Sequence, residues 1–184
     1  MQNFISILRG INVGSHNKIK MPELKSLYEE LKCKDVITYI QSGNVICNIA
    51  NNITDQQLSK KIEKKILEKF GYKVPVITRT VAEMEGVLLA NPFIKQSGID
   101  IEKLHVTFLA DVPSQPAVDN IKKFDYPPDK FIIIDKEAYL YCPVNYGNTK
   151  LSNTFFENKL KATATTRNWR TVNALVKLAT AKPI

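Results

Sequence analysis

The spacing of apolar residues predicts an alternation of strands and helices along the first half of the chain. Short apolar runs indicate buried strands, whereas apolar residues that recur every three to four positions indicate one face of a helix. The predicted elements are a strand at Phe4–Leu8, a helix at Pro22–Leu31, strands at Val36–Gln41 and Asn44–Asn48, a helix that begins after Thr54, and a strand at Val74–Thr78. Thr54, with Gln57 three residues on, forms a capping box. The order of the first half is therefore βαββαβ.

The second half of the chain repeats this order less cleanly. Thr80 and Glu83 predict the start of a connecting helix that ends near Asn91-Pro92. After it we expect a strand at Leu104–Ala110, a helix at Ser114–Lys123, a hairpin of Phe131–Ile134 with Ala138–Cys142, a helix at about Ser152–Leu160, an extended stretch at Ala162–Thr166 and a final helix.

Two successive split βαβ units predict an α+β fold, with duplicated ferredoxin-like (βαββαβ) halves and a C-terminal helix. The first half is expected at residues 1–79 and the connecting helix and loop at 80–103. The second half, with the terminal helix, is expected at 104–184, and the whole chain is expected to form one compact unit.

Composition places the chain among ordinary cytoplasmic domains. With 184 residues, 44% of them hydrophobic, the chain can bury a core without disulfides or metals. Its three cysteines are an odd number without metal-ligand spacing, so we expect reduced, mostly buried thiols. The first apolar run stops at Arg9 without a preceding cationic segment, which argues against a secretory signal. No apolar run approaches the roughly 20 residues that a membrane helix needs.

The net charge of +8 is unevenly distributed. Residues 145–184 carry seven cations and one acid, which gives +6, whereas residues 1–144 carry 19 cations and 17 acids, which gives +2. A local positive field raises the concentration of anionic partners. The alternative is a solvated basic face that only aids solubility.

The loop that follows the first strand is a candidate site for an anion. It runs from Arg9 to Met21 and leads from a strand into a helix, where backbone N–H groups and the positive helix end can hold an anion. It is neither a Walker loop nor a dinucleotide fingerprint. The candidate ligand-binding residues here are Arg9, Gly10, Asn12, Gly14 and Lys18. The alternative is a structural crossover loop whose arginine pairs with a nearby acid.

Two further segments carry candidate ligand-binding residues. Ser42 and Asn44 belong to a tight turn that need not lie beside the first loop. Near the C-terminus, hydroxyls, an asparagine and arginines crowd the start of the final helix, and a second polar loop leads into the helix before it. The candidates in these two C-terminal segments are Lys150, Ser152, Thr166, Arg167 and Asn168.

Catalytic arrangements receive little support from the sequence. His16 and His105 have no acidic partner at a telling spacing, and no nucleophile elbow surrounds a serine. We therefore assign no catalytic residue, no metal site and no cofactor. Trp169 has the helical spacing of a core residue. Tyr139 and Tyr141 share one strand face, where they either stack on RNA bases or, as we favour, are buried.

Several motifs resemble a known family. They are Leu8-Arg9-Gly10-Ile11-Asn12-Val13-Gly14, Lys18–Met21, Gln41-Ser42-Gly43-Asn44, Asn91-Pro92-Phe93 and Ala164-Thr165-Thr166-Arg167-Asn168-Trp169. In this order and spacing, from about Phe4 to Leu178, they resemble the bacterial domain-of-unknown-function family numbered 1697. The resemblance implies an α+β fold with duplicated ferredoxin-like halves and implies no activity, substrate or catalytic residue. Ser15 departs from the family pattern, which commonly has a second consecutive glycine there.

Three functions stay open at this point. The first is a cytoplasmic protein that binds a phosphate-bearing ligand, either a nucleotide or a nucleic-acid backbone, in a basic cleft. The second is a small enzyme that acts on an anionic metabolite, with His16 or Ser42 in proton transfer. The third is a structural or protein-interaction module. The first requires Arg9 and Arg167 to line one hollow, which the sequence does not determine, and the sequence leaves the oligomeric state open.

Overall fold

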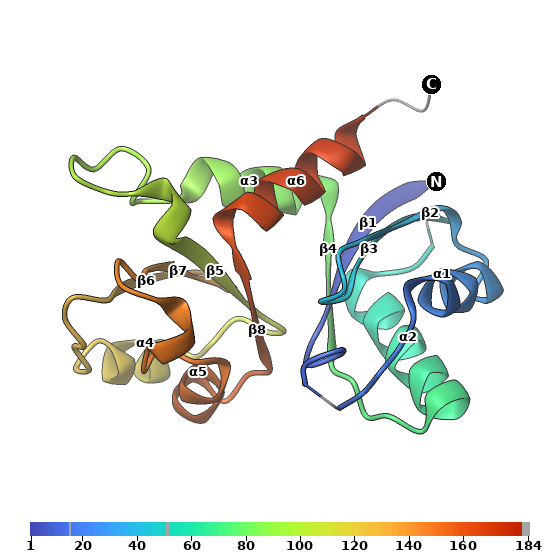
Figure 1. The fold of residues 1–184 in the computed structure, drawn as a ribbon, viewed down its shortest axis with the longest axis horizontal. Helices are drawn as coiled ribbons and strands as arrows, with labels where there is room; N and C mark the ends of the chain where they lie inside the picture. Colours follow the sequence, from blue (N-terminus) through green and yellow to red (C-terminus); the bar gives the residue numbers. More distant parts are fainter. Residues whose placement is uncertain (15, 51, 182–184) are drawn as a thin grey trace. The chain divides into compact units, whose positions relative to one another are not determined.

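The computed structural model describes residues 1–14, 16–50 and 52–181. They form a mixed α+β fold with two four-stranded antiparallel sheets, in the strand orders β2-β3-β1-β4 and β6-β7-β5-β8 (Figure 1). Contacts along the chain divide the described residues into two compact units. The first comprises Met1–Glu85 with Ala174–Ile184, and the second comprises Gly86–Asn173.

The first unit packs two helices on one face of its sheet. Its elements are β1 (Gln2–Leu8), α1 (Met21–Glu30), β2 (Lys34–Tyr39), β3 (Asn44–Ile49), α2 (Asp55–Phe70) and β4 (Val76–Thr80). The expected capping box starts α2: Thr54 Oγ1 accepts from Gln57 N at 3.1 Å, and Gln57 Oε1 accepts from Thr54 N at 3.0 Å. Gly71 ends α2 with a φ of 74°, a left-handed conformation suited to glycine.

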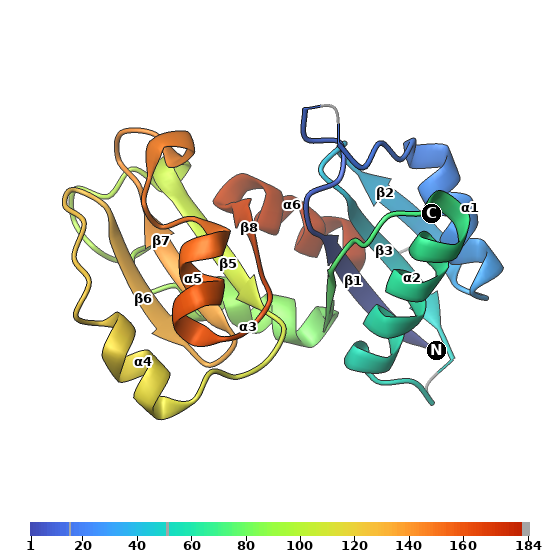
Figure 2. The same ribbon diagram turned by 90° about the horizontal axis from the view of Figure 1, so that it is seen from below.

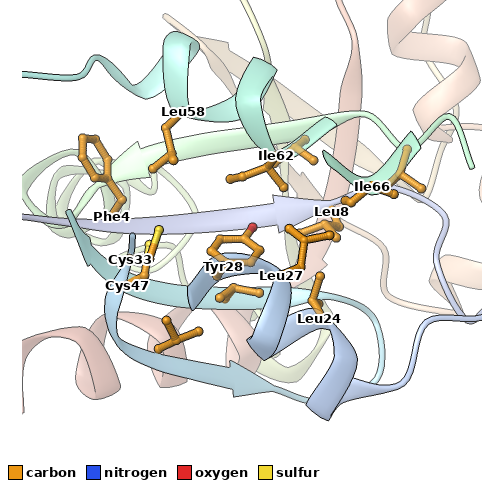
Figure 3. Close-up of a cluster of buried hydrophobic side chains, with 14 of the residues drawn as sticks. Phe4, Leu8, Leu24, Leu27, Tyr28, Cys33, Cys47, Leu58, Ile62 and Ile66 are labelled. Atoms are coloured by element: carbon orange, nitrogen blue, oxygen red, sulfur yellow. The ribbon is translucent and has the colours of Figure 1, made fainter. Parts of the chain in front are cut away.

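Alternation along β1 produces the core of the first unit. Phe4 and Leu8 point to the helix-covered face and are fully buried, together with Tyr28 of α1 and Ile62 of α2 (Figure 3). Successive side chains of a strand point to opposite faces, so residues two or four apart share this core. The helices contribute buried residues at intervals of three or four, as amphipathic helices do.

The second unit has the same order of elements. They are β5 (Leu104–Leu109), α4 (Gln115–Ile121), β6 (Lys130–Ile134), β7 (Glu137–Tyr141), α5 (Asn153–Leu160) and β8 (Ala164–Asn168). Two short 3-10 turns, η1 (Ile101–Lys103) and η2 (Tyr146–Asn148), precede β5 and α5. Figure 2 shows α4 and α5 over one face of this sheet, where Leu109, Leu140 and Phe156 are fully buried.

Two more helices, α3 (Val81–Ala90) and α6 (Trp169–Thr180), complete the described chain. α3 begins at the predicted capping box, in which Glu83 N donates to Thr80 Oγ1 at 3.2 Å and Thr80 N donates to Glu83 Oε2 at 2.8 Å. Trp169 is buried, in keeping with its expected place in a core. Across the described residues, no helix has both the length and the apolar character that crossing a membrane requires.

The predicted elements all occur, and two strands begin two residues later than expected. β4 begins at Val76 because Pro75 has no N–H to enter the ladder, and the Pro75 carbonyl accepts instead from Arg9 N at 2.9 Å. β8 runs to Asn168, so Arg167 lies in a strand and α6 begins only at Trp169. Arg167 therefore follows the alternation of β8 and does not belong to the first turn of α6.

Candidate functional site

Asn12 holds the first loop in place through its side-chain amide. Its Nδ2 donates to the carbonyls of Ile19 and Gln41, both at 2.9 Å, and its Oδ1 accepts from Ile19 N at 3.0 Å. These contacts join the two arms of the loop and tie it to the turn between β2 and β3. Its φ of 55° is left-handed, a conformation that asparagine tolerates better than most residues. The structure thus gives Asn12 a structural function.

The glycines of the loop have positive φ angles, which glycine adopts readily. Gly10 has a φ of +68°, and no atom lies within 4 Å of the position that its Cβ would occupy. Gly14 has a φ of +59°, and Val13 and His16 form an isolated antiparallel bridge. His16 is exposed there, and Ser15 lies outside the described residues.

The start of α1 is capped from within the chain. Glu23 Oε2 accepts from Lys20 N at 3.3 Å, and the Lys20 carbonyl accepts from Leu24 N at 3.0 Å. A carboxylate therefore already occupies the positive end of this helix, the place where an anion would be held. Lys18 and Lys20 are exposed, whereas Arg9 is half-buried and its backbone is paired with Pro75.

The turn at residues 41–44 lies directly against the first loop, a proximity that the sequence did not require. Gly43 O accepts from Leu8 N at 2.8 Å, and a Cβ on Gly43 would lie 2.5 Å from Ile11 Cδ1. Asn44 is buried and its Nδ2 donates to Tyr39 O at 3.0 Å and to Ser42 Oγ at 3.2 Å. Ser42 Oγ and Asn44 Nδ2 thus form hydrogen bonds that support the turn.

In the second unit, Arg167 is a buried cation. Its side chain is 9% exposed, and Nη1 donates to Thr166 O at 2.9 Å and to Thr165 Oγ1 at 3.1 Å. Burial disfavours the charged guanidinium and lowers the pKa of Arg167 to about 10, while the nearby Tyr146 phenol acts in the opposite direction. Arg167 pairs with Val106 across the β5–β8 ladder. Arg9 belongs to the first unit and Arg167 to the second.

A polar network surrounds Tyr146 beside the start of β5. The rings of His105 and Tyr146 are stacked, with centroids 4.4 Å apart. Thr166 Oγ1 lies 2.7 Å from Thr107 Oγ1 and donates to Asn153 Oδ1 at 2.7 Å. Burial raises the pKa of Tyr146 and lowers the pKa of His105, and a hydrogen bond with Thr166 partly offsets the shift at Tyr146. These contacts fix the turn η2 against β5 and β8.

The starts of α5 and α6 are also capped by their own side chains. Ser152 Oγ accepts from Phe155 N at 3.2 Å, and Asn168 Oδ1 accepts from Thr171 N at 2.8 Å. Each of these caps satisfies one N–H group that a helix start otherwise leaves exposed. The structure therefore uses Ser152 and Asn168 to begin helices.

A pocket of the second unit lies beside η2 and has a volume of about 410 Å³. Its polar and aromatic lining comprises Asp125, Tyr126, Asp129, Asn145, Asn148, Thr149 and Lys150. Lys150 Nζ lies 5.3 Å from the centroid of the Tyr126 ring, within the range of a cation–π contact.

Two sets of hydrogen bonds shape the wall of this pocket. Asn145 Oδ1 accepts from Gly147 N at 2.9 Å, which fixes the start of η2. Asp129 Oδ2 accepts from Thr149 Oγ1, and Thr149 Oγ1 also accepts from Leu151 N at 3.1 Å. The residues on either side of η2 are thus anchored to the segment that contains Asp129.

The structure brings only some of the sequence-derived candidates together. The first loop and the 41–44 turn converge, and Lys150 alone among the candidates lines the pocket. Sequence reasoning missed Asp125, Tyr126 and Asp129, although the segment Asp125-Tyr126-Pro127-Pro128-Asp129 has the composition of an ordered loop. Among the described residues, no group of three or more His, Cys, Asp or Glu side chains is placed to hold a metal ion.

Comparison with known proteins identifies the family. A model of the family described as a protein of unknown function (DUF1697) matches residues 1–139, and the chain belongs to this family. The chain is also similar to a solved structure, that of the conserved bacterial protein SP0830 from Streptococcus pneumoniae. The two share 18% sequence identity over 98% of this chain and 99% of that chain, with a TM-score of 0.78, a likeness of fold alone. No curated protein matches.

Proposed function

We propose that the protein binds a phosphate-bearing ligand, a single nucleotide, in the pocket of the second unit. The observation that carries the proposal is the set of groups around one hollow of about 410 Å³: an ammonium, an aromatic ring, two carboxylates and two side-chain amides. Ligand pockets of this size combine apolar surface with a few polar groups that fix the orientation of the ligand.

Lys150 is the proposed phosphate contact. It is exposed, and its flexible side chain can turn its ammonium group from the Tyr126 ring to a phosphate without loss of a salt bridge. The amide oxygen of Asn145 is used in the turn, so its NH2 group is the part that can donate to a ligand. The ring of Tyr126 offers a surface on which a base can stack.

The charge of the pocket favours a nucleotide over a nucleic-acid backbone. Asp125 and Asp129 line the same pocket as Lys150, so the carboxylates outnumber the ammonium groups among the lining residues. A run of phosphates would meet like charge here, whereas sugar hydroxyls and base amino groups can donate to a carboxylate. The enzyme alternative assigns proton transfer to His16 or Ser42. Ser42 Oγ accepts a hydrogen bond from the Asn44 amide within a turn, which favours a structural function for Ser42.

We also propose that the two units are copies of one ferredoxin-like βαββαβ arrangement. The order of elements is the same in both units. The two sheets also have the same strand order, in which β5, β6, β7 and β8 take the places of β1, β2, β3 and β4. A cytoplasmic location is part of the same proposal, supported by three free, buried thiols.

Isothermal titration calorimetry with AMP, adenosine and inorganic phosphate tests the binding proposal. We expect AMP to bind more tightly than either fragment, because only AMP engages both the ring and the ammonium. Lys150→Ala should weaken AMP by about tenfold or more, since a hydrogen bond to a charged group contributes about 1.5–3 kcal/mol. Lys123→Ala is the matched control, because Lys123 is an exposed lysine of the same unit that does not line the pocket.

Two outcomes would reject the proposal. One is the absence of binding by AMP, ADP and ATP at millimolar concentration. The other is an equal loss of affinity in Lys150→Ala and Lys123→Ala. Tight binding of single-stranded RNA with a steep dependence on salt would instead support the nucleic-acid alternative, because each neutralised phosphate releases counterions.

A further inference from the structure

Two cysteines of the first unit meet in its core. Cys33 lies in the turn between α1 and β2, and Cys47 lies in β3. Both belong to the buried cluster between the sheet and its two helices, with Cys33 5% exposed and Cys47 fully buried. Figure 3 shows the two side chains next to each other.

The backbone explains why these thiols meet. Cys33 N donates to Tyr28 O at 3.1 Å, which folds the chain back at the end of α1. The next residue, Lys34, pairs with Asn48 across the β2–β3 ladder, so each cysteine is the chain neighbour of one member of this pair. The ladder then shifts register between Lys34 and Ile37, where Asp35 has a φ of 51°. A register shift of this kind changes the direction in which the neighbouring side chains point, as a β-bulge does.

The two thiols are chemically unequal. The neighbouring Cys47 thiol lowers the pKa of Cys33, whereas the Cys33 thiol and burial raise the pKa of Cys47. The thiolate is the reactive form of a cysteine, so Cys33 is the nucleophile of the pair.

We propose that Cys33 and Cys47 form a reversible oxidation site that closes a disulfide when the protein meets a peroxide. The Cys33 thiolate attacks one peroxide oxygen, the O–O bond breaks, and the departing hydroxide takes up a proton to give water. The product is Cys33 sulfenic acid. The Cys47 sulfur then attacks the Cys33 sulfur, its proton leaves with the sulfenic hydroxyl as a second water, and the S–S bond forms. Two thiols are oxidised by two electrons and one peroxide is reduced.

The third cysteine provides an internal control. Cys142 is fully buried in the second unit and belongs to a different hydrophobic cluster. Burial raises the pKa of its thiol to about 11, so it is poor in thiolate at neutral pH. Peroxide should therefore leave Cys142 reduced under conditions that oxidise the pair.

The test exposes reduced, folded protein to hydrogen peroxide, alkylates it in denaturant and measures its intact and peptide masses. Wild type and Cys142→Ser should each lose about 2 Da before alkylation and yield a cross-linked peptide of Cys33 and Cys47. Dithiothreitol should restore the original mass. Cys33→Ser and Cys47→Ser should form no intramolecular disulfide, and Cys47→Ser should accumulate a sulfenic acid that dimedone traps.

The wild-type protein alone can overturn the proposal, so the outcome does not depend on the folding of the variants. The inference fails if native protein keeps three alkylatable thiols, or if Cys142 oxidises as fast as the pair. It also fails if Cys33 is driven to sulfinic acid with no cross-linked peptide. The nucleotide proposal concerns the second unit, and none of these results affects it.

Discussion

The side-chain amide of Asn12 is expected to stabilise the first unit more than any other polar group of its loop. The change to test is Asn12→Ala, which removes two donated hydrogen bonds and one accepted hydrogen bond. The loop would then lose its connection to the turn between β2 and β3.

The size of the loss follows from these contacts. Three hydrogen bonds at a net 0.5–1.5 kcal/mol each amount to about 3 kcal/mol, and water at this half-exposed site reduces the sum to about 2 kcal/mol. Alanine also tolerates the left-handed φ of 55° less well than asparagine, which adds about 1 kcal/mol. We therefore expect Asn12→Ala to lower the free energy of unfolding by about 3 kcal/mol, a large share of a typical domain stability.

Urea unfolding followed by far-ultraviolet circular dichroism measures this loss, with two variants that separate its causes. Asn12→Gly removes the same hydrogen bonds but allows the φ, so it should lose about 2 kcal/mol. Asn17→Ala removes a single side-chain hydrogen bond, from Nδ2 to Gly10 O at 3.2 Å, at a similar left-handed φ of 47°, and should lose about 2 kcal/mol. If Asn12→Ala stays within about 0.5 kcal/mol of wild type, the range of ordinary surface changes, the amide is not a structural clamp.

Two further changes probe the same unit. Gly43→Ala should lower the free energy of unfolding by about 2–4 kcal/mol, measured by thermal unfolding, because its Cβ would lie 2.5 Å from Ile11 Cδ1 at a φ of +80°. Gly71→Ala, at a similar φ but with open space around the Cβ, should lower it by about 1 kcal/mol. Equal losses in the two variants would contradict the packing argument. Lys69 Nζ donates to Glu30 Oε1 at 2.6 Å, and this hydrogen bond lowers the pKa of Glu30. The pair therefore stabilises the fold above the ordinary pKa of 4.5. This stabilisation is lost as the pH falls through the lower pKa that Glu30 has in the folded state. Glu30→Gln should thus slightly lower the melting temperature at pH 7 and match wild type at pH 3 or in high salt, and a difference that persists at pH 3 would show that the ion pair is not its source.

Local patterns were sufficient to predict the elements of the fold. The capping box of Thr54 and Gln57 lies at the start of α2 and that of Thr80 and Glu83 at the start of α3, because both depend on contacts within four residues. Boundaries were less predictable where the partner strand decides them. The late start of β4 depends on Pro75, whose missing N–H matters only once the strand is paired.

The candidate site was harder to predict because it depends on contacts between distant residues. Lys150 was a candidate from charge and loop context, and it lines the pocket. Its neighbours Tyr126 and Asp129 are more than twenty positions earlier in the chain, and nothing in their local sequence indicates that they meet Lys150. The pairing of Cys33 with Cys47 likewise depends on the register of β2 against β3, which a single sequence leaves open.

The first loop shows why glycine and asparagine are an ambiguous sign of anion binding. An anion cradle and a self-contained loop both need positive φ and short polar side chains, so the two have the same composition. What separates them is whether the polar groups already have partners within the chain. Here the side-chain amide of Asn12 is hydrogen-bonded to the loop and the adjacent turn, and Glu23 caps the helix that follows. An anion at the start of α1 would have to displace a carboxylate that is part of the chain itself. At Lys150 the ammonium group contacts the Tyr126 ring, so a phosphate would replace a cation–π contact there, which is why the functional proposal rests on this pocket.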